Sequence, residues 1–280
     1  MISLDRIKHN STLKQEIPHI KLYLYKCYRS FQLLFGNLIE RNLHEQRPNL
    51  PTNTTEFIGR AVLDTIGLLI PNIDPALQAH TGYDPRYRSL GVFSSRTGAA
   101  GQIMAVDEAV KATNCEILTI ELPRDTKGWG GHGNYIVLGS ESVSDVRRAI
   151  EISLELTNVN AGELYISQAG HLEFAYSARA GAALAQAFDV PYGQPFGFIC
   201  GSPAAIGLVI ADTAVKASHV EIVKYMTPNI GTSHSNEVII AVTGDASSVK
   251  EAVITARETG LQLLNSMGSI AESPTGIPYL

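Results

Sequence analysis

The sequence is poor in charge, in cysteine and in long apolar runs. Only 18% of its 280 residues are charged, against about a quarter in a typical soluble protein, which suggests that other subunits cover part of the surface. The three cysteines, Cys27, Cys115 and Cys200, form no CxxC pair, so we expect no disulfide framework and no metal site. No apolar run is long enough for a bilayer span and no secretory signal is recognised, so we expect no membrane partner.

Charge separates the first 50 residues from the rest. Eight basic and four acidic residues lie in 1–50, although the whole chain carries a formal net charge of −5. That overall charge argues against a nucleic-acid partner. Residues 19–45 have apolar side chains at helical spacing with basic ones between them, which predicts an amphipathic helix. Four interpretations of this segment are open: a tether to a partner protein, a basic amphipathic surface helix, an extra helix packed on the body, or translation from a mistaken start codon. The Pro- and Thr-rich residues 46–55 predict a linker, so 1–55 form an extension.

The remainder contains an internal repeat. DEAVKATNCEI at 107–117 matches DTAVKASHVEI at 212–222, and the similarity extends to SLGVFSSRTGAAGQIM against PFGFICGSPAAIGLVI on the amino-terminal side. The period is too long for a solenoid. We therefore expect two copies of one small domain, at 56–158 and 159–270, followed by a tail at 271–280.

Each copy predicts the same series of elements. Strands are expected at 91–93, 117–122 and 135–138 in the first copy, and at 197–199, 220–226 and 238–242 in the second. Helices are expected at 99–113 and 143–156, and at 204–218 and 246–264. A strand-then-helix rhythm precedes them at 64–80 and 171–187. This alternation, with hairpins that require antiparallel pairing, predicts an α+β fold.

The repeated motif carries a family resemblance. The DEAVKA…EI helix and strand, the Gly-rich loop, the apolar strand and the S-x-V-x-x-A helix resemble the bacterial microcompartment (BMC) shell domain. The strand–helix units at 64–80 and 171–187 resemble its circularly permuted form, and two such copies in one chain resemble the trimer-forming tandem shell proteins. The likeness covers 56–280 and includes GHLEFAYSARAG and GTSHSNE.

The resemblance implies a fold, partners and a location. Each copy would be a ferredoxin-like α/β sandwich, and a homotrimer would form a flat pseudohexamer. Such tiles would meet other shell proteins edge to edge in a microcompartment shell in the cytoplasm, as structural proteins without catalysis or cofactor. By the same analogy, residues 1–50 would face the lumen and hold encapsulated enzymes. In this family the lysine of the helix motif lies at the tile edge, which would place Lys111 and Lys216 there, although a solvated lysine is the ordinary alternative.

The loops after the second strand of each copy would surround the symmetry axis in this family. Glycines let backbone polar groups face a passage, and hydroxyl, amide and imidazole groups offer hydrogen bonds to solutes. Small polar metabolites, namely alcohols, diols and aldehydes, are the cargo by analogy. The alternative is that these are tight loops at a subunit contact. The candidate lining and gating residues are Arg124, Asp125, Thr126, Lys127, Gly128, Gly130, His132, Thr232, Ser233, His234, Ser235 and Asn236.

An enzyme and a small-molecule sensor are the two alternatives to a shell protein. An enzyme is disfavoured because the G-x-G-x-x-G match at 128–133 precedes a strand rather than a helix. In addition, His132, His171 and His234 lack metal spacing. Asp107 and Asp212 at matching helix sites suit structure, and Cys200 beside a strand predicts a buried thiol. A cytosolic small-molecule-binding tandem sensor remains the alternative, because duplicated α/β domains often bind ligands where they meet.

Overall fold

In the computed structural model, residues 55–125, 131–268, 270–273, 275 and 280 are described. The chain divides into two compact units, Met1–Asn49 and Leu50–Leu280, and the described residues belong to the second. The predicted amphipathic helix at 19–45 and nearly all of the predicted linker lie outside the described residues.

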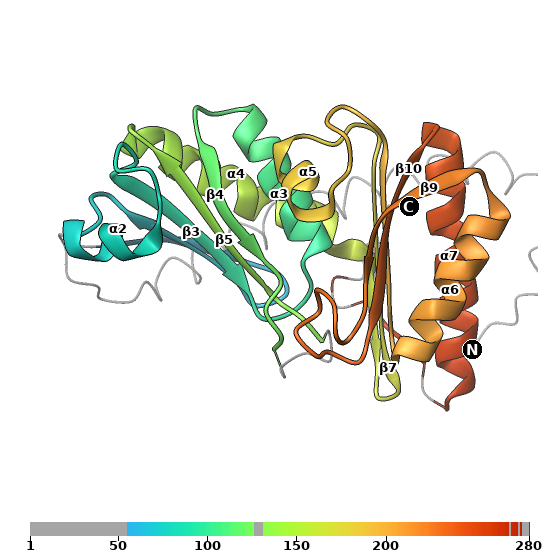
Figure 1. Ribbon diagram of the computed structural model, residues 1–280. Coiled ribbons are helices and arrows are strands. Elements are labelled where there is room, and N and C mark those ends of the chain that lie inside the picture. The colour runs from blue at the N-terminus through green and yellow to red at the C-terminus, as the bar shows by residue number, and fades with distance from the viewer. Residues whose placement is uncertain (1–54, 126–130, 269, 274, 276–279) are drawn as a thin grey trace, which may run out of the picture. The chain divides into compact units, whose positions relative to one another are not determined.

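The described residues form two five-stranded antiparallel sheets, one from each copy of the repeat (Figure 1). The first has the order β1-β2-β3-β5-β4, and the second has the equivalent order β6-β7-β8-β10-β9. The strands of the first sheet are β1 (Glu56–Ala61), β2 (Thr65–Ile70), β3 (Ser89–Ser95), β4 (Glu116–Glu121) and β5 (Asn134–Ser140). Those of the second are β6 (Leu164–Ser167), β7 (Gly170–Ser177), β8 (Phe196–Ser202), β9 (Val220–Met226) and β10 (Val238–Gly244).

Two long helices pack on one face of each sheet (Figure 1). They are α3 (Ala100–Lys111) and α4 (Val143–Asn160) in the first copy, and α6 (Ala204–Ala217) and α7 (Ala246–Ser266) in the second. Short helices α2 (Pro75–Thr81) and α5 (Ala182–Phe188) follow β2 and β7, and a 3₁₀ turn (Ala161–Glu163) joins the copies. The α+β fold with duplicated units is therefore confirmed, and the repeat elements lie where the pattern predicts them.

The sequence pattern missed the first strand of each copy. β1 pairs with β2, and β6 pairs with β7, as antiparallel hairpins. β6 is four residues long and β1 contains a register shift between Phe57 and Gly59, so neither shows sustained period-2 alternation. The domain boundaries at 158/159 and 270/271 stay predictions.

Strands β7, β8 and β10 of the second sheet are buried on both faces for most of their length, which explains their nearly continuous apolar sequences. Along β7, Leu172 and Phe174 pack in the cluster with α6 and α7, whereas Ala175 belongs to a cluster shared with the first copy. That shared core includes Ile103 of α3 and Phe198 of β8. The two copies are thus joined by a common apolar core between α3 and the second sheet.

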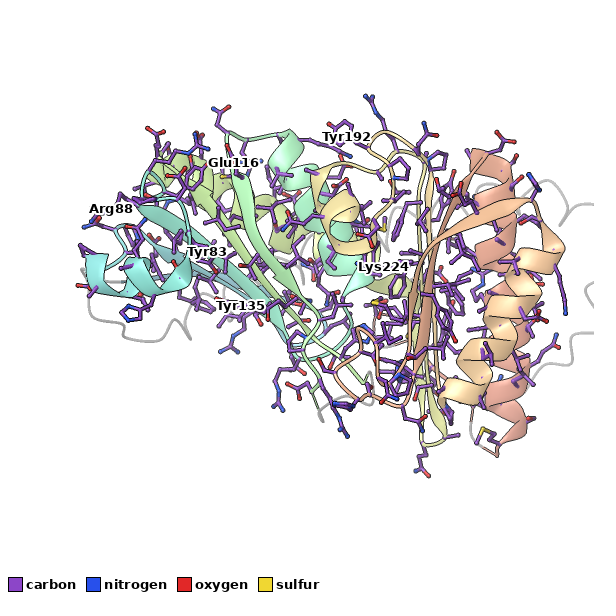
Figure 2. The ribbon with its side chains drawn as sticks, in the orientation of Figure 1. Tyr83, Arg88, Glu116, Tyr135, Tyr192 and Lys224 are labelled. Atoms are coloured by element: carbon purple, nitrogen blue, oxygen red, sulfur yellow. The ribbon has the colours of Figure 1, made fainter. Side chains whose placement is uncertain are left out.

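The opposite face of the first sheet is covered by α2 and the loop after it. Ile73, Tyr87, Leu90 and Val137 form a separate cluster there. The hydroxyls of Tyr83 and Thr119 lie 3.0 Å apart on this side, where Figure 2 also shows Tyr135. Since the core helices and this layer fix the strands, the loops at the strand ends are set in position by both faces of the sheet.

Candidate functional site

The loop after β4 is held at its two ends. The N–H of Gly133 donates to the carbonyl of Pro123 at 2.9 Å, and the Asp125 carboxylate accepts two hydrogen bonds from Arg96, at 2.8 and 2.9 Å. Arg124 is exposed. Thr126, Lys127, Gly128 and Gly130 lie outside the described residues. Within the described chain, Asp125 therefore pairs with Arg96.

The loop after β9 presents three polar side chains to solvent. Ser233, His234 and Asn236 are exposed, and the first two adopt left-handed backbone conformations with φ of 50° and 65°. Two successive residues other than glycine rarely adopt left-handed conformations, so hydrogen bonds within the loop must stabilise this turn. Among these, the His234 N–H donates to Pro228 at 2.9 Å, and the Thr232 hydroxyl donates to the Thr227 carbonyl at 2.8 Å.

Three of the predicted lining residues point into the protein instead. His132, Thr232 and Ser235 are buried among the described residues, and their role in a lining stays a prediction. Thr232 and Ser235 close their own turn, with the Ser235 N–H donating to the Thr232 carbonyl at 2.9 Å. His132 turns inward because two buried carboxylates of the second copy accept hydrogen bonds from its ring.

His132 bridges Glu173 of β7 and Glu237, which precedes β10. Its Nε2 lies 3.0 Å from Glu173 Oε2, and its Nδ1 lies 3.0 Å from Glu237 Oε1. Burial by itself would lower the pKa of His132, but the two carboxylates outweigh it and raise that pKa to about 10. Burial would raise the pKa of Glu237, yet His132 and His171 hold it far below its usual range. The three side chains therefore form a buried ionic bridge between the copies.

The amino terminus of α3 extends this bridge. The N–H groups of Ala99 and Ala100 donate to Glu173 Oε1 at 3.0 and 2.8 Å. Burial would raise the pKa of Glu173, but the His132 hydrogen bond and charge, together with these N–H groups, lower it. A carboxylate at a helix amino terminus is favoured by the helix dipole as well. The first copy thus supplies the cationic and N–H donors for the acids of the second.

A second polar group adjoins Glu237. His171 Nε2 lies 3.1 Å from Glu237 Oε2, and Cys200 Sγ lies 3.8 Å from His171 Nε2 and 3.7 Å from Glu237 Oε2. All three side chains are buried. Sequence reasoning missed this cluster because its members are dozens of residues apart. One signal in the sequence could have indicated the cluster, namely a polar residue inside an otherwise apolar strand, such as Glu173 in β7.

The helices α3 and α5 meet where the copies join. Asp107 of α3 accepts hydrogen bonds from the N–H groups of Gly181 and Ala183 at 2.8 and 2.9 Å, so it caps α5 from the other copy. Lys111 pairs with Asp107 at 2.9 Å and donates to the Arg179 carbonyl at 3.3 Å. The predicted structural role of Asp107 is thus seen directly as a cap across the domain contact.

Comparisons with known proteins identify the fold. The pattern described as the BMC domain matches residues 89–169 and 196–274. The chain belongs to the BMC-domain family. A bacterial microcompartment shell protein of Citrobacter freundii, PduB, is 51% identical over 215 residues, which cover 77% of this chain and 80% of that protein. PduB of Limosilactobacillus reuteri is 43% identical, with 79% of this chain and 93% of that protein covered.

Solved structures agree with this assignment. The crystal structure of EtuB from Clostridium kluyveri has a TM-score of 0.77 and 45% identity, covering 82% of this chain and all of that one. The crystal structure of a trimeric bacterial microcompartment shell protein PduB has a TM-score of 0.75 and 42% identity, covering 78% and 96%. The chain is a structural protein of a bacterial microcompartment shell. Within the described residues, no helix has the length and apolar character needed to cross a membrane.

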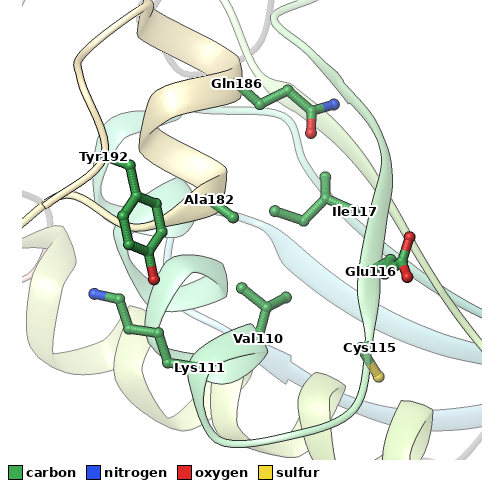
Figure 3. Close-up of a pocket in the computed structure, with 8 residues that line it drawn as sticks. All are labelled: Val110, Lys111, Cys115, Glu116, Ile117, Ala182, Gln186 and Tyr192. Carbon is green, nitrogen blue, oxygen red and sulfur yellow. The ribbon is translucent and has the colours of Figure 1, made fainter.

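A pocket lies where the two BMC domains meet (Figure 3). It has a volume of about 320 Å³. Lys111 and Tyr192 lie on one side, and Glu116 and Ile117 of β4 lie across from them (Figure 3). Cys115 of the first BMC domain and Gln186 of the second also line it. A charged and hydroxyl-bearing lining of this kind suits a polar molecule or a polar side chain of another protein.

The second BMC-domain lysine is in a different setting from Lys111. Lys216 pairs with Asp212 at 2.6 Å, and its side chain is 74% exposed. Lys111 is engaged by the contact between the BMC domains within the chain, whereas Lys216 remains available to another molecule. The tile-edge role of both lysines stays a prediction.

Proposed function

We propose that this shell protein forms a homotrimer whose exposed polar loops surround a passage for small alcohols, diols and aldehydes, and that it has no catalytic role. The observation that supports the trimer is that equivalent helix surfaces of the two BMC domains differ in burial. The surfaces of α3 and α5 are buried against each other within the chain, whereas the equivalent surfaces of α6 and α2 are exposed.

The two halves of the internal contact are Ile103 of α3 and Leu184 of α5. They are 0% and 1% exposed and belong to one apolar cluster. Leu208 occupies in α6 the place of Ile103 at the repeat offset of the matched motifs, and it is 53% exposed. Leu77 is the third residue of the seven-residue helix α2, as Leu184 is of α5, and it is 56% exposed. Among the described residues, both halves of the same contact are therefore exposed as well.

A contact of this kind is head-to-tail. The α6 surface of one protomer would receive α2 of the next, and such heterologous contacts form a ring when the rotation closes. Leu208 and Leu77 are already half-buried, so burying the remainder of both side chains would stabilise the ring by about 1.5–3 kcal/mol for each contact. One relative of the same fold is described as trimeric, which supports closure after three protomers.

Within such a ring, we assign the passage to the exposed side chains Ser233, His234 and Asn236, together with Arg124 and the half-buried Asp125. The hydroxyl, amide and imidazole groups can exchange hydrogen bonds with solutes of similar polarity. Thr126, Lys127, Gly128 and Gly130 remain part of the proposed loop. Asn236 is also anchored, since its Oδ1 accepts from the Ala204 N–H at 3.2 Å.

The remaining parts of the proposal concern partners and place. Tiles would join other shell proteins edge to edge through Lys216 and Lys111 in a compartment in the cytoplasm. Residues 1–50 would hold encapsulated enzymes. Deletion of residues 1–50 tests this, because cargo that stayed bound to shells of the shortened protein would exclude the tether.

The assembly is tested by Leu208→Glu and Leu77→Glu in the full chain. Each removes one half of the same contact, so both should weaken the trimer by roughly 30-fold or more in sedimentation equilibrium. Val159→Glu is the control, because Val159 is 58% exposed on α4, away from the proposed contact. Equal trimer stability in all three variants would exclude this interface.

The passage is tested in shells whose permeable tile is this protein. Ser233→Trp should slow the entry of a small diol to an enclosed enzyme, and Ser144→Trp on exposed α4 should not. Equal entry rates would remove the loop from the passage. The pocket beside Lys111 favours the alternative of a small-molecule-binding sensor, which would remain as isolated particles where the shell protein gives extended layers in electron microscopy.

A further inference from the structure

The second sheet carries a compact set of metal-binding side chains on the face turned toward α3. His171 on β7, Cys200 on β8 and Glu237 next to β10 come from three neighbouring strands, and all three are buried. We propose that His171 Nε2, Cys200 Sγ and Glu237 Oε2 bind a divalent transition-metal ion of the zinc type between the two BMC domains.

The spacing of the three atoms supports an ion at their centre. They lie 3.1, 3.7 and 3.8 Å from one another. Bonds of about 2.0–2.3 Å in a tetrahedral zinc site separate neighbouring ligand atoms by roughly 3.3–3.8 Å. An ion therefore fits among the three atoms with only a small movement of the side chains.

The donor types select the class of metal. A thiolate, an imidazole nitrogen and a carboxylate oxygen are the three ligand types of zinc, whereas Ca²⁺ and Mg²⁺ take oxygen ligands. Without an ion, burial keeps the pKa of the Cys200 thiol well above its ordinary value. Binding would replace the thiol proton with the metal, as metal binding to cysteine generally does.

Charge at the site also favours a cation. The carboxyl groups of Glu173 and Glu237 are both buried in the cluster, each 3.0 Å from one nitrogen of the His132 ring. Buried charges are costly unless they are compensated. A divalent ion bound with a Cys200 thiolate adds a net single positive charge beside these two acids.

The surrounding contacts orient the ligands. His132 Nδ1 donates to Glu237 Oε1, which leaves Oε2 directed at His171 and Cys200. Outer hydrogen bonds of this kind fix the carboxylates of metal sites. His171 Nδ1 makes no hydrogen bond to the described residues, so it can carry the ring proton once Nε2 exchanges its hydrogen bond to Glu237 for a bond to the ion.

The position of the site has a structural consequence. His132 stands at the end of the first loop and Glu237 directly follows the second. An ion bound to Glu237 would therefore join the bases of both exposed loops through side chains of both BMC domains. The site is independent of whether those loops line a passage.

The test uses the purified full chain after removal of metal with a chelator and reloading with Zn²⁺ or Co²⁺. We expect about one metal ion per chain by elemental analysis, and a thiolate-to-cobalt charge-transfer band in the near ultraviolet. Cys200→Ser and His171→Gln should abolish the band. Cys115→Ser is the matched control, because Cys115 is buried outside the cluster, and Cys27→Ser controls for the extension.

Three outcomes would overturn the site. One is a folded full chain that retains no metal and gives no cobalt band. Another is a band that survives Cys200→Ser, and the third is a band that disappears with Cys115→Ser or Cys27→Ser instead. Circular dichroism confirms that each variant is folded, and His171→Gln gives a second reading if Cys200→Ser is unstable.

Discussion

Asp107 and Asp212 occupy the same position in the two halves of the repeat, but only Asp107 is buried. The Asp107 side chain is 1% exposed and receives backbone N–H groups of α5, whereas Asp212 is 56% exposed and contacts Lys216. The same motif thus acts as a helix cap in one copy and as a surface ion pair in the other. The difference comes from what lies against each helix.

Replacing these two aspartates should separate the roles. Asp107→Ala removes the acceptor for three N–H groups at the start of α5, and losing a cap in a buried setting should cost more than about 2 kcal/mol. Asp212→Ala should change the free energy of unfolding by less than about 0.5 kcal/mol. Urea unfolding in a Leu208→Glu background measures both without a trimer contribution. Equal losses would contradict the capping role.

Gly131 should tolerate no side chain. Its φ is +63°, and an added Cβ would meet Ser235 Oγ and come within 2.6 Å of Glu237 Oε2. Gly131→Ala should therefore destabilise the protein by about 2–4 kcal/mol, combining backbone strain with a steric conflict. Gly193→Ala provides the control, because Gly193 also has a positive φ, of +83°, but open space around it. Thermal unfolding that shows the same shift for both would mean that backbone strain alone acts.

His132 should be required for the joining of the two BMC domains. His132→Gln removes the cation between Glu173 and Glu237, and leaving buried charges without their partner typically costs about 3–5 kcal/mol. His234→Gln on the exposed loop should cost less than about 0.5 kcal/mol. Chemical denaturation of both variants measures the difference. If His132→Gln unfolds at the wild-type denaturant concentration, the ionic bridge contributes nothing.

The two helix-motif lysines should have different effects. Lys216→Ala should leave unfolding unchanged and reduce the extended layers seen by electron microscopy, because the Lys216 side chain is 74% exposed and its surface pair with Asp212 leaves it accessible to another molecule. Lys111→Ala should lower the stability of the chain by about 1–3 kcal/mol, since Asp107 would lose a cation and Arg179 would lose a donor. Layers of normal extent from Lys216→Ala would exclude its tile-edge role.

Much of the fold was predictable because its signals are local. The repeat placed α3 and α6, and the apolar strands β8 and β10 followed from their composition. β6 could not be found in this way, because a four-residue strand carries too little periodicity. The sequence also placed Ser233, His234 and Asn236 in a polar loop, since loop polarity is a local property, and their role in lining a passage stays a prediction.

The buried cluster was not predictable from spacing. The sequence places His132 in a polar loop and Cys200 beside a strand, with no interval that links them to each other or to Glu237. Its inward position depends on Glu173, which is brought there by β7 of the other copy. A contact between residues of two domains leaves no regular interval in the sequence.

The sequence by itself determined the duplicated α+β unit, its helices and most of its strands, because periodicity and turn residues act over a few neighbouring positions. Only the tertiary structure decided which of two matching residues is buried, as for Asp107 against Asp212. The physical reason is that burial depends on the element packed opposite: α3 of the first copy packs against α5, whereas none of the described residues covers Asp212 on α6.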